Sequence, residues 1–140
     1  MKTLFYVSTF QQTAWIINHM MPGGIPVLNY DAGDLVHESL EDACALGLDI
    51  AADPSVRNRG TDVLAIDIPD TLYDELVLHG DIQEHSRTDA LGARLLSVNR
   101  EACRIINSNC PVATKRYYLE GCEPGERELR DTSIPPAYLN

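Results

Sequence analysis

The chain has 140 residues and a mass of 15.5 kDa, which is the length of one domain. Hydrophobic residues make up 44% and charged residues 23% of it, a balance typical of a globular protein with a buried core. The formal net charge of −10 argues against duplex DNA or RNA as a direct partner, because phosphate binding requires a basic surface.

No segment approaches the roughly 18 apolar residues of a membrane helix, and the opening Met-Lys-Thr-Leu-Phe-Tyr-Val is too short and strand-like for a secretory signal. We therefore expect a cytoplasmic protein without membrane contact. The negative charge is concentrated near the start, since no basic residue lies between Lys2 and Arg57. Seven acidic residues lie there: Asp31, Asp34, Glu38, Glu41, Asp42, Asp49 and Asp53.

The first predicted elements are a strand and a helix. Residues 3–7 are β-branched, aromatic and apolar, which favours a buried strand. Ser8 and Thr9 are N-cap residue types, and each is followed three residues later by glutamine, the pattern of a capping box. Apolar residues at helical spacing then predict a helix over about 10–21, which Pro22 and two glycines end.

The next elements are shorter. Residues 25–30 predict an edge strand, because a proline interrupts them. Residues 35–37 predict a brief extended piece. Ser39 offers an N-cap for a helix whose apolar face runs from Leu40 to Ala51.

The clearest strand prediction covers residues 62–68. The residues between Asp62 and Asp67 are all apolar and do not alternate with polar ones, which is typical of a strand that is covered on both faces. Asp70 is predicted to cap a short helix that stops at Gly80. Residues 81–90 lack periodicity and predict a surface loop, and residues 92–98 predict an extended segment.

The last third predicts a helix capped by Ser97 or Asn99 and ending near 107. A strand over 115–120 and a charged turn over 121–128 follow, and an apolar tail closes the chain at 134–139. Strands and helices thus alternate with irregular connections. We expect an α+β single domain over 1–140, with a mixed, split β-sheet flanked by about three helices.

Motifs of established chemistry are absent from the sequence. It has no G-x-S-x-G, G-x-G-x-x-G or G-K-[ST] segment, and its four histidines have no metal-binding spacing. The four cysteines are expected to be buried and reduced, although Cys103, Cys110 and Cys122 with a histidine are an alternative metal set. Four aspartates around residues 62–74 are explained by capping and solvation more simply than by acid-base catalysis. We expect no metal.

One layout of short motifs resembles a known family. Leu-Phe-Tyr-Val-Ser at 4–8 leads into a helix ended by proline and glycine. Val-His-Glu-Ser-Leu-Glu-Asp-Ala follows at 36–43, then Asp-Val-Leu-Ala-Ile-Asp-Ile-Pro-Asp at 62–70, and Ile-Pro-Pro-Ala-Tyr starts at 134. The layout resembles the small ADP-ribosyltransferase-like fold, which includes the RNA 2'-phosphotransferases and several bacterial toxins. The resemblance implies NAD as cofactor and a protein or nucleic acid as substrate.

The resemblance also implies a set of site residues. The first-strand position that carries a catalytic Arg or His falls on Tyr6, a departure, because tyrosine supplies no positive charge. The implied catalytic residues are Tyr6, Ser8, His37 and Glu120, with Glu120 as the acid that stabilises a ribosyl cation. The implied cofactor-binding residues are Tyr30, Arg94, Tyr117 and Tyr118, with the tyrosines stacking on nicotinamide.

Two hypotheses therefore remain open. The first is an NAD-binding ADP-ribosyltransferase or 2'-phosphotransferase relative with a non-canonical or degenerate site. The second is a non-catalytic acidic protein, of the inhibitor, immunity or nucleic-acid-mimic type, that docks on a basic protein. The long acidic stretch after Lys2, without any basic residue, motivates it.

Overall fold

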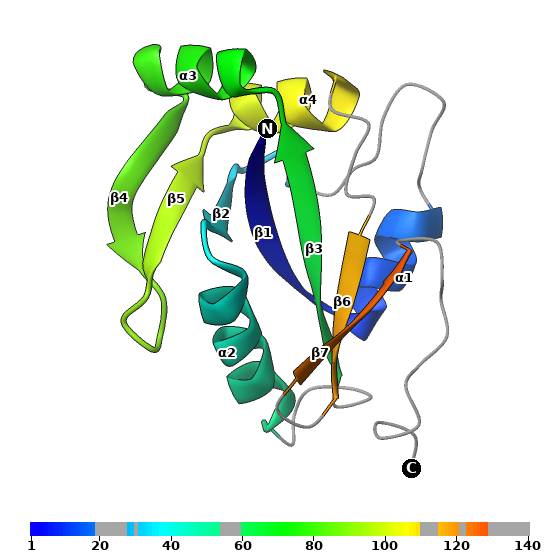
Figure 1. Cartoon of the computed structure of the whole chain (residues 1–140). Helices are drawn as coiled ribbons and strands as arrows, with labels where there is room; N and C mark the ends of the chain where they lie inside the picture. Colours follow the sequence, from blue (N-terminus) through cyan, green and yellow to red (C-terminus); the bar gives the residue numbers. More distant parts are fainter. Residues whose placement is uncertain (19–27, 30, 54–59, 110–114, 121–122, 129–140) are drawn as a thin grey trace.

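The computed structural model describes residues 1–18, 28–29, 31–53, 60–109, 115–120 and 123–128 (Figure 1). Strands and helices alternate in its first half and strands dominate its end. Their order is β1 (Lys2–Thr9), α1 (Phe10–Asn18), β2 (Asp34–His37), α2 (Leu40–Ala51), β3 (Thr61–Ile68), α3 (Asp70–Leu78), β4 (Ile82–Thr88), β5 (Arg94–Val98), α4 (Arg100–Asn109), β6 (Lys115–Glu120) and β7 (Glu123–Glu128). The α+β prediction is confirmed.

The described strands form one seven-stranded sheet in the order β4-β5-β2-β1-β3-β6-β7. Every neighbouring pair in it is antiparallel. The predicted mixed, split sheet is therefore wrong for this part of the chain. Apolar patterning indicates which strands are buried, but it does not indicate in which direction each strand runs.

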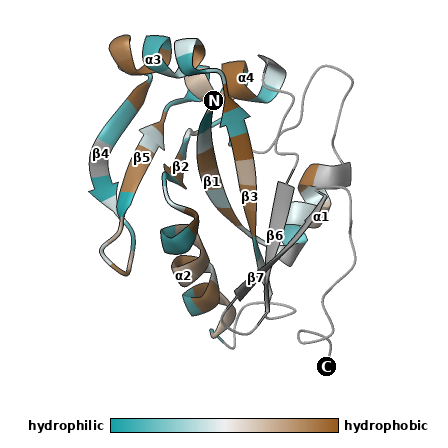
Figure 2. Cartoon of the chain, viewed as in Figure 1, coloured by the Kyte–Doolittle hydropathy of each residue, from teal (hydrophilic) through white to brown (hydrophobic). Residues whose placement is uncertain are grey.

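The centre of the sheet is the pairing of β1 with β3, which is in register from Lys2–Ile68 to Thr9–Thr61. Directly opposite residues in an antiparallel pair share a face, and successive residues alternate between faces. Because β3 is covered on both sides, it is almost continuously buried. Figure 2 shows β3 as mostly hydrophobic and the edge strand β4 as largely hydrophilic.

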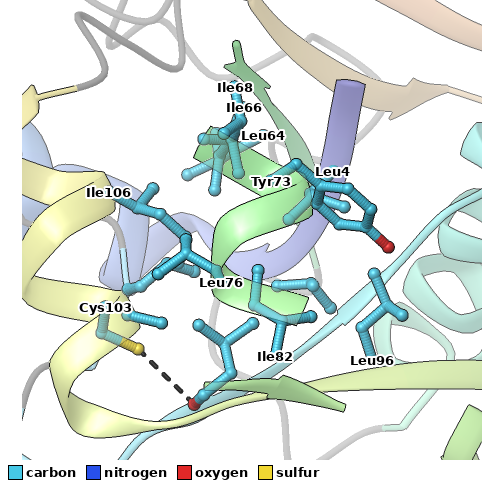
Figure 3. Packing of buried hydrophobic residues seen from close by; sticks show 14 of the residues in the cluster. Leu4, Leu64, Ile66, Ile68, Tyr73, Leu76, Ile82, Leu96, Cys103 and Ile106 are labelled. Atoms are coloured by element: carbon cyan, nitrogen blue, oxygen red, sulfur yellow. Dashed lines mark hydrogen bonds between the residues drawn. The ribbon is translucent and has the colours of Figure 1, made fainter. Parts of the chain in front are cut away.

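One face of the sheet, here called the main face, carries the larger core. Leu4 and Leu64 lie on it with side chains of α1, α3 and α4, including Ile16, Leu76 and Ile106 (Figure 3). The other face, here called the α2 face, has a smaller core. It consists of Ala43, Cys44 and Val63, packed against the partly buried Phe5, Val7, Leu40 and Leu48.

The helix starts show which predicted caps form. Thr9 and Gln12 make a reciprocal capping box, with Thr9 N–H to Gln12 Oε1 at 2.9 Å and Gln12 N–H to Thr9 Oγ1 at 3.2 Å. Asn99 caps α4 through the N–H of Ala102 at 2.9 Å, and Ser39 caps α2. The predicted cap at Asp70 is wrong, because α3 begins there and follows Pro69.

Two predicted irregular segments are strands. Residues 81–90 contain β4, and residues 121–128 contain β7. Both are edge strands, which are short of apolar residues because each has a neighbour on one side only, and β4 pairs with β5 around a bulge between Gln83 and Arg87. Predicted segments 25–30 and 134–139 lie wholly or mostly outside the described residues. No described helix has the length and apolar character needed to span a bilayer.

Candidate functional site

The predicted site residues of β1 lie on the main face. Tyr6 is half-buried and packs against the main core. Burial, followed by the negative charge of Asp34 and then by Cys103, raises the pKa of the Tyr6 phenol to about 12. The phenol is therefore neutral near pH 7. It can form a hydrogen bond or stack, but it supplies neither a positive charge nor an effective general base.

Ser8 is fully buried in a polar cluster at the junction of β1 and α1. The hydroxyl of Thr13 lies 3.0 Å from Ser8 Oγ and 2.8 Å from Asp62 Oδ2, and all three side chains are 0% exposed. The Thr13 hydroxyl also lies 3.1 Å from the Thr9 carbonyl oxygen. The Thr13 hydroxyl thus links Ser8 and Asp62 and ties α1 to the centre of the sheet. Ser8 has no exposed surface that a ligand could reach.

His37 lies on the α2 face, because it is opposite Phe5 of β1 and Leu95 of β5. Its Nε2 is 2.7 Å from Asp89 Oδ2, and both side chains are at most 3% exposed. The structure therefore does not bring Tyr6 and His37, both implied as catalytic residues, together. Tyr6 and Phe5 are adjacent in β1 and point to opposite faces, so the sheet itself separates Tyr6 from His37.

The Asp89 carboxylate holds the turn between β4 and β5. Its Oδ1 accepts the N–H groups of Leu91 and Ala93, both at 2.9 Å. Burial alone would raise the pKa of Asp89, but the hydrogen bond from His37 and the two backbone donors lower it below the ordinary value of 3.8. The pair is thus an internal link between β2 and the hairpin turn.

The other predicted site residues that the structure describes lie in β5 and β6. Arg94 is exposed at the start of β5, opposite Thr88. Tyr117 and Tyr118 are in β6, opposite Val63 and Asp62 of β3, and Glu120 ends that strand. Tyr30 lies outside the described residues. The register brings Tyr118 to the row of Ser8 and Asp62, but it does not bring Arg94 to that row.

Thr13 and Asp89 are the polar residues that sequence reasoning missed. Thr13 lies inside a helix among glutamines and apolar residues, so no local pattern distinguishes its buried hydroxyl from an exposed one. Asp89 is three residues before Gly92, which has a φ of +86°, and an aspartate three residues before a glycine is typical of a turn. That signal predicts the turn but not its histidine partner.

The outward side of α2 is acidic. Glu41, Asp42 and Asp49 are exposed on it, and the exposed residue between them is Ala45. We call Glu41, Asp42 and Asp49 the α2 carboxylates. Lys2 is the one basic residue among residues 1–53. It is opposite Ile68 of β3 and lies on the main face. Its Nζ is 2.8 Å from Glu38 Oε1, so its charge is engaged away from α2.

Cysteines and metals add no chemistry to the described part of the chain. Cys44 and Cys103 are free and buried, and burial raises the pKa of both thiols. The expectation of buried thiols is confirmed for these two, while Cys110 and Cys122 lie outside the described residues. Within the described ranges, no group of three or more His, Cys, Asp or Glu is placed to hold a metal ion.

Comparisons of the chain with protein-family models, curated proteins and solved structures find no match.

Proposed function

We propose that the chain is a non-catalytic binding protein that docks on a cationic protein surface through the α2 carboxylates. The observation that carries this proposal is the outward side of α2, where Glu41, Asp42 and Asp49 are exposed and the other exposed residue is Ala45. Exposed carboxylates on a rigid helix present a fixed pattern of negative charge. Such a pattern accelerates association with a basic surface and selects against acidic partners.

Two further observations support it. Lys2, the one basic residue among residues 1–53, is engaged by Glu38, and its Nζ lies 5.0 Å from the centroid of the Tyr73 ring on the other face. The buried side of α2 consists of residues with small side chains or none, namely Ala43, Cys44 and Gly47. Thr61 Oγ1 donates a hydrogen bond of 2.7 Å to the Gly47 carbonyl oxygen, which fixes the helix against β3.

A titration with a fluorescently labelled lysine-rich peptide tests the proposal. We expect the full chain to bind the peptide at low ionic strength and to lose affinity as salt rises, because exposed charges are screened. The variant Glu41→Gln/Asp42→Asn should bind about tenfold more weakly, a loss of about 1.4 kcal/mol. Equal binding by the variant and the unmodified chain would contradict the proposal.

A nicotinamide-nucleotide site is the second candidate function. The observation that favours it is Tyr6, the half-buried first-strand residue of the predicted site, which lies on the main face. Calorimetric titration with NAD and analysis for released nicotinamide test this candidate. If NAD binds, Tyr6→Ala should weaken binding and Tyr6→Phe should retain part of it through ring stacking. Absence of both heat and nicotinamide release would remove the candidate.

A further inference from the structure

The turn between β4 and β5, residues 89–93, exposes the apolar side chain of Leu91 to solvent. Asp89 receives the buried His37 on one carboxylate oxygen and two backbone N–H groups on the other. The N–H of Gly92 donates to the Asp89 carbonyl oxygen at 3.0 Å, and the N–H of Asp89 donates to the Ala93 carbonyl oxygen at 2.8 Å. The turn is thus held in one shape, in which Leu91 is 52% exposed.

The cation nearest this turn on the α2 face is Arg87. It is opposite Leu95 of β5, which is in turn opposite His37 of β2, so these three residues form one row across the sheet. Directly opposite residues share a face, so Arg87 lies on the side of the sheet that carries α2. Arg87 is exposed. The hairpin end therefore combines a positive charge with an apolar side chain.

The hairpin end and the start of α2 are neighbours. The His37–Asp89 link fixes the turn to β2, and Ser39, two residues after His37, is the N-cap of α2. Figure 1 shows the hairpin loop and the start of α2 at the same end of β5 and β2, as the pairing of His37 with Leu95 requires. Glu41 and Asp42 are exposed in that turn. The Arg87 charge and the carboxylates at the start of α2 thus lie on the same side of the sheet.

Adjacent patches of opposite charge make a surface complementary to itself. A two-fold axis between two identical molecules brings patch i of one onto patch j of the other, and patch j onto patch i. Arg87 and Leu91 of one molecule would then meet Glu41 and Asp42 of its copy, twice in the same interface. An acidic partner is less well suited, because the acidic α2 would repel it. A basic partner would be attracted by the α2 carboxylates alone, whereas a second copy also pairs Arg87.

We propose that a second copy of this chain docks on the surface formed by Arg87, Leu91, Glu41 and Asp42, and that the result is a two-fold symmetric dimer. The proposal does not rest on the cationic partner described above, although both would use the α2 carboxylates. A dimer would therefore compete with that partner for α2.

Sedimentation equilibrium of the full chain tests the dimer. We expect a reversible dimer at about 0.15 M salt, where a Debye length of about 8 Å screens the overall negative charge more than it screens contact pairs. Arg87→Glu and Asp42→Arg should each weaken the dimer by at least about tenfold. Mixed in equal amounts, the two variants should form a heterodimer more stable than the dimer of either variant alone, because each contact between positions 87 and 42 then joins opposite charges.

Matched variants separate this interface from general effects of charge and hydrophobicity. Arg100→Glu makes the same charge change on α4, which covers the main face, and Leu78→Ser removes a leucine that is 81% exposed on α3. Neither should change the dimer, whereas Leu91→Ser should weaken it. The proposal is overturned if the chain is monomeric at all concentrations, if Arg100→Glu equals Arg87→Glu in effect, or if mixing the swapped variants restores nothing.

Discussion

The two faces of the sheet differ in how they use their side chains. The main face buries large residues beneath three helices, and its buried Ser8 and Asp62 both lie within hydrogen-bond distance of the Thr13 hydroxyl. The α2 face carries one helix with a small-residue contact, and a His–Asp pair at the edge of that contact. The difference shows that the larger share of the buried core lies on the main face, whereas α2 exposes charged side chains on its outward side.

The largest expected effect compares one leucine from each face. Leu64→Ala on the main face should lower the free energy of unfolding by about 2–5 kcal/mol, because Leu64 is 0% exposed and its removal leaves a cavity. Leu48→Ala on α2 should cost clearly less, since Leu48 is only partly buried. Urea unfolding measures both, and a larger loss for Leu48→Ala would reverse the comparison.

The next effect concerns Gly33, which directly precedes β2 and packs closely against the backbone of Val98. Gly33 has a φ of +85°, and a Cβ there would lie 2.8 Å from the Val98 carbonyl oxygen. Gly33→Ala should therefore cost more than the roughly 1–2 kcal/mol of a left-handed non-glycine residue. Gly80 has a φ of +78° with nothing within 4 Å, so Gly80→Ala should cost only that conformational term. Equal melting temperatures for the two variants would contradict the assignment.

A smaller effect is expected from the polar cluster of the main face. Thr13→Val keeps the shape of the side chain but removes the hydroxyl that lies 2.8 Å from Asp62 Oδ2. Both residues are fully buried, so the loss should be about 1–3 kcal/mol in unfolding free energy. Thr13→Ser, which retains the hydroxyl, is the control. Stability of Thr13→Val at or above that of the unmodified chain would show that the cluster is not stabilising.

The smallest effect tests the polar pair of the α2 face by its pH dependence. The folded-state pKa of Asp89 lies below 3.8, so the pair stabilises the fold above pH 3.8 and this contribution is lost as pH falls through the folded-state pKa. Asp89→Asn should lower stability by about 1–2 kcal/mol at neutral pH and by progressively less in acid. A difference between variant and unmodified chain that stayed constant down to the acid range would contradict this link.

Asp34 provides a comparison of opposite sign. Burial raises its pKa above 3.8, despite hydrogen bonds from the backbone of Asn29 and Leu35. Its ionisation therefore opposes folding, and its contribution to stability falls as pH rises from 3.8 through the folded-state pKa. The two carboxylates should thus shape the acid side of the stability profile in opposite directions.

The sequence predicts the parts of the fold that depend on local patterns. Buried β3, the Thr9–Gln12 capping box and the Asn99 cap follow from apolar runs and short-range residue pairs. Strand direction and the edge strands do not follow from them. Ile82, which is buried, is the one apolar residue in the sequence of β4, so the pairing of β4 with β5 leaves little trace in its composition.

The candidate site was harder to predict, because it depends on which residues share a face. His37 was correctly placed at a strand end, but residue parity in β1 and the register to β2 put it on the opposite face from Tyr6. Its partner Asp89 is 52 residues away. The acidic character of the first half is evident from the sequence. Which side of α2 exposes its carboxylates becomes evident only from the structure, in which Ala43, Cys44 and Gly47 are buried.

The most direct test of the central claim compares two neutralised pairs on the helices that cover opposite faces. Glu41→Gln/Asp42→Asn on α2 and Asp74→Asn/Glu75→Gln on α3 remove the same charges from exposed positions. Binding of the labelled lysine-rich peptide at low salt should fall about tenfold for the α2 pair and little for the α3 pair. Equal losses for the two pairs would show that the peptide responds to net charge alone, and would contradict a binding role for α2.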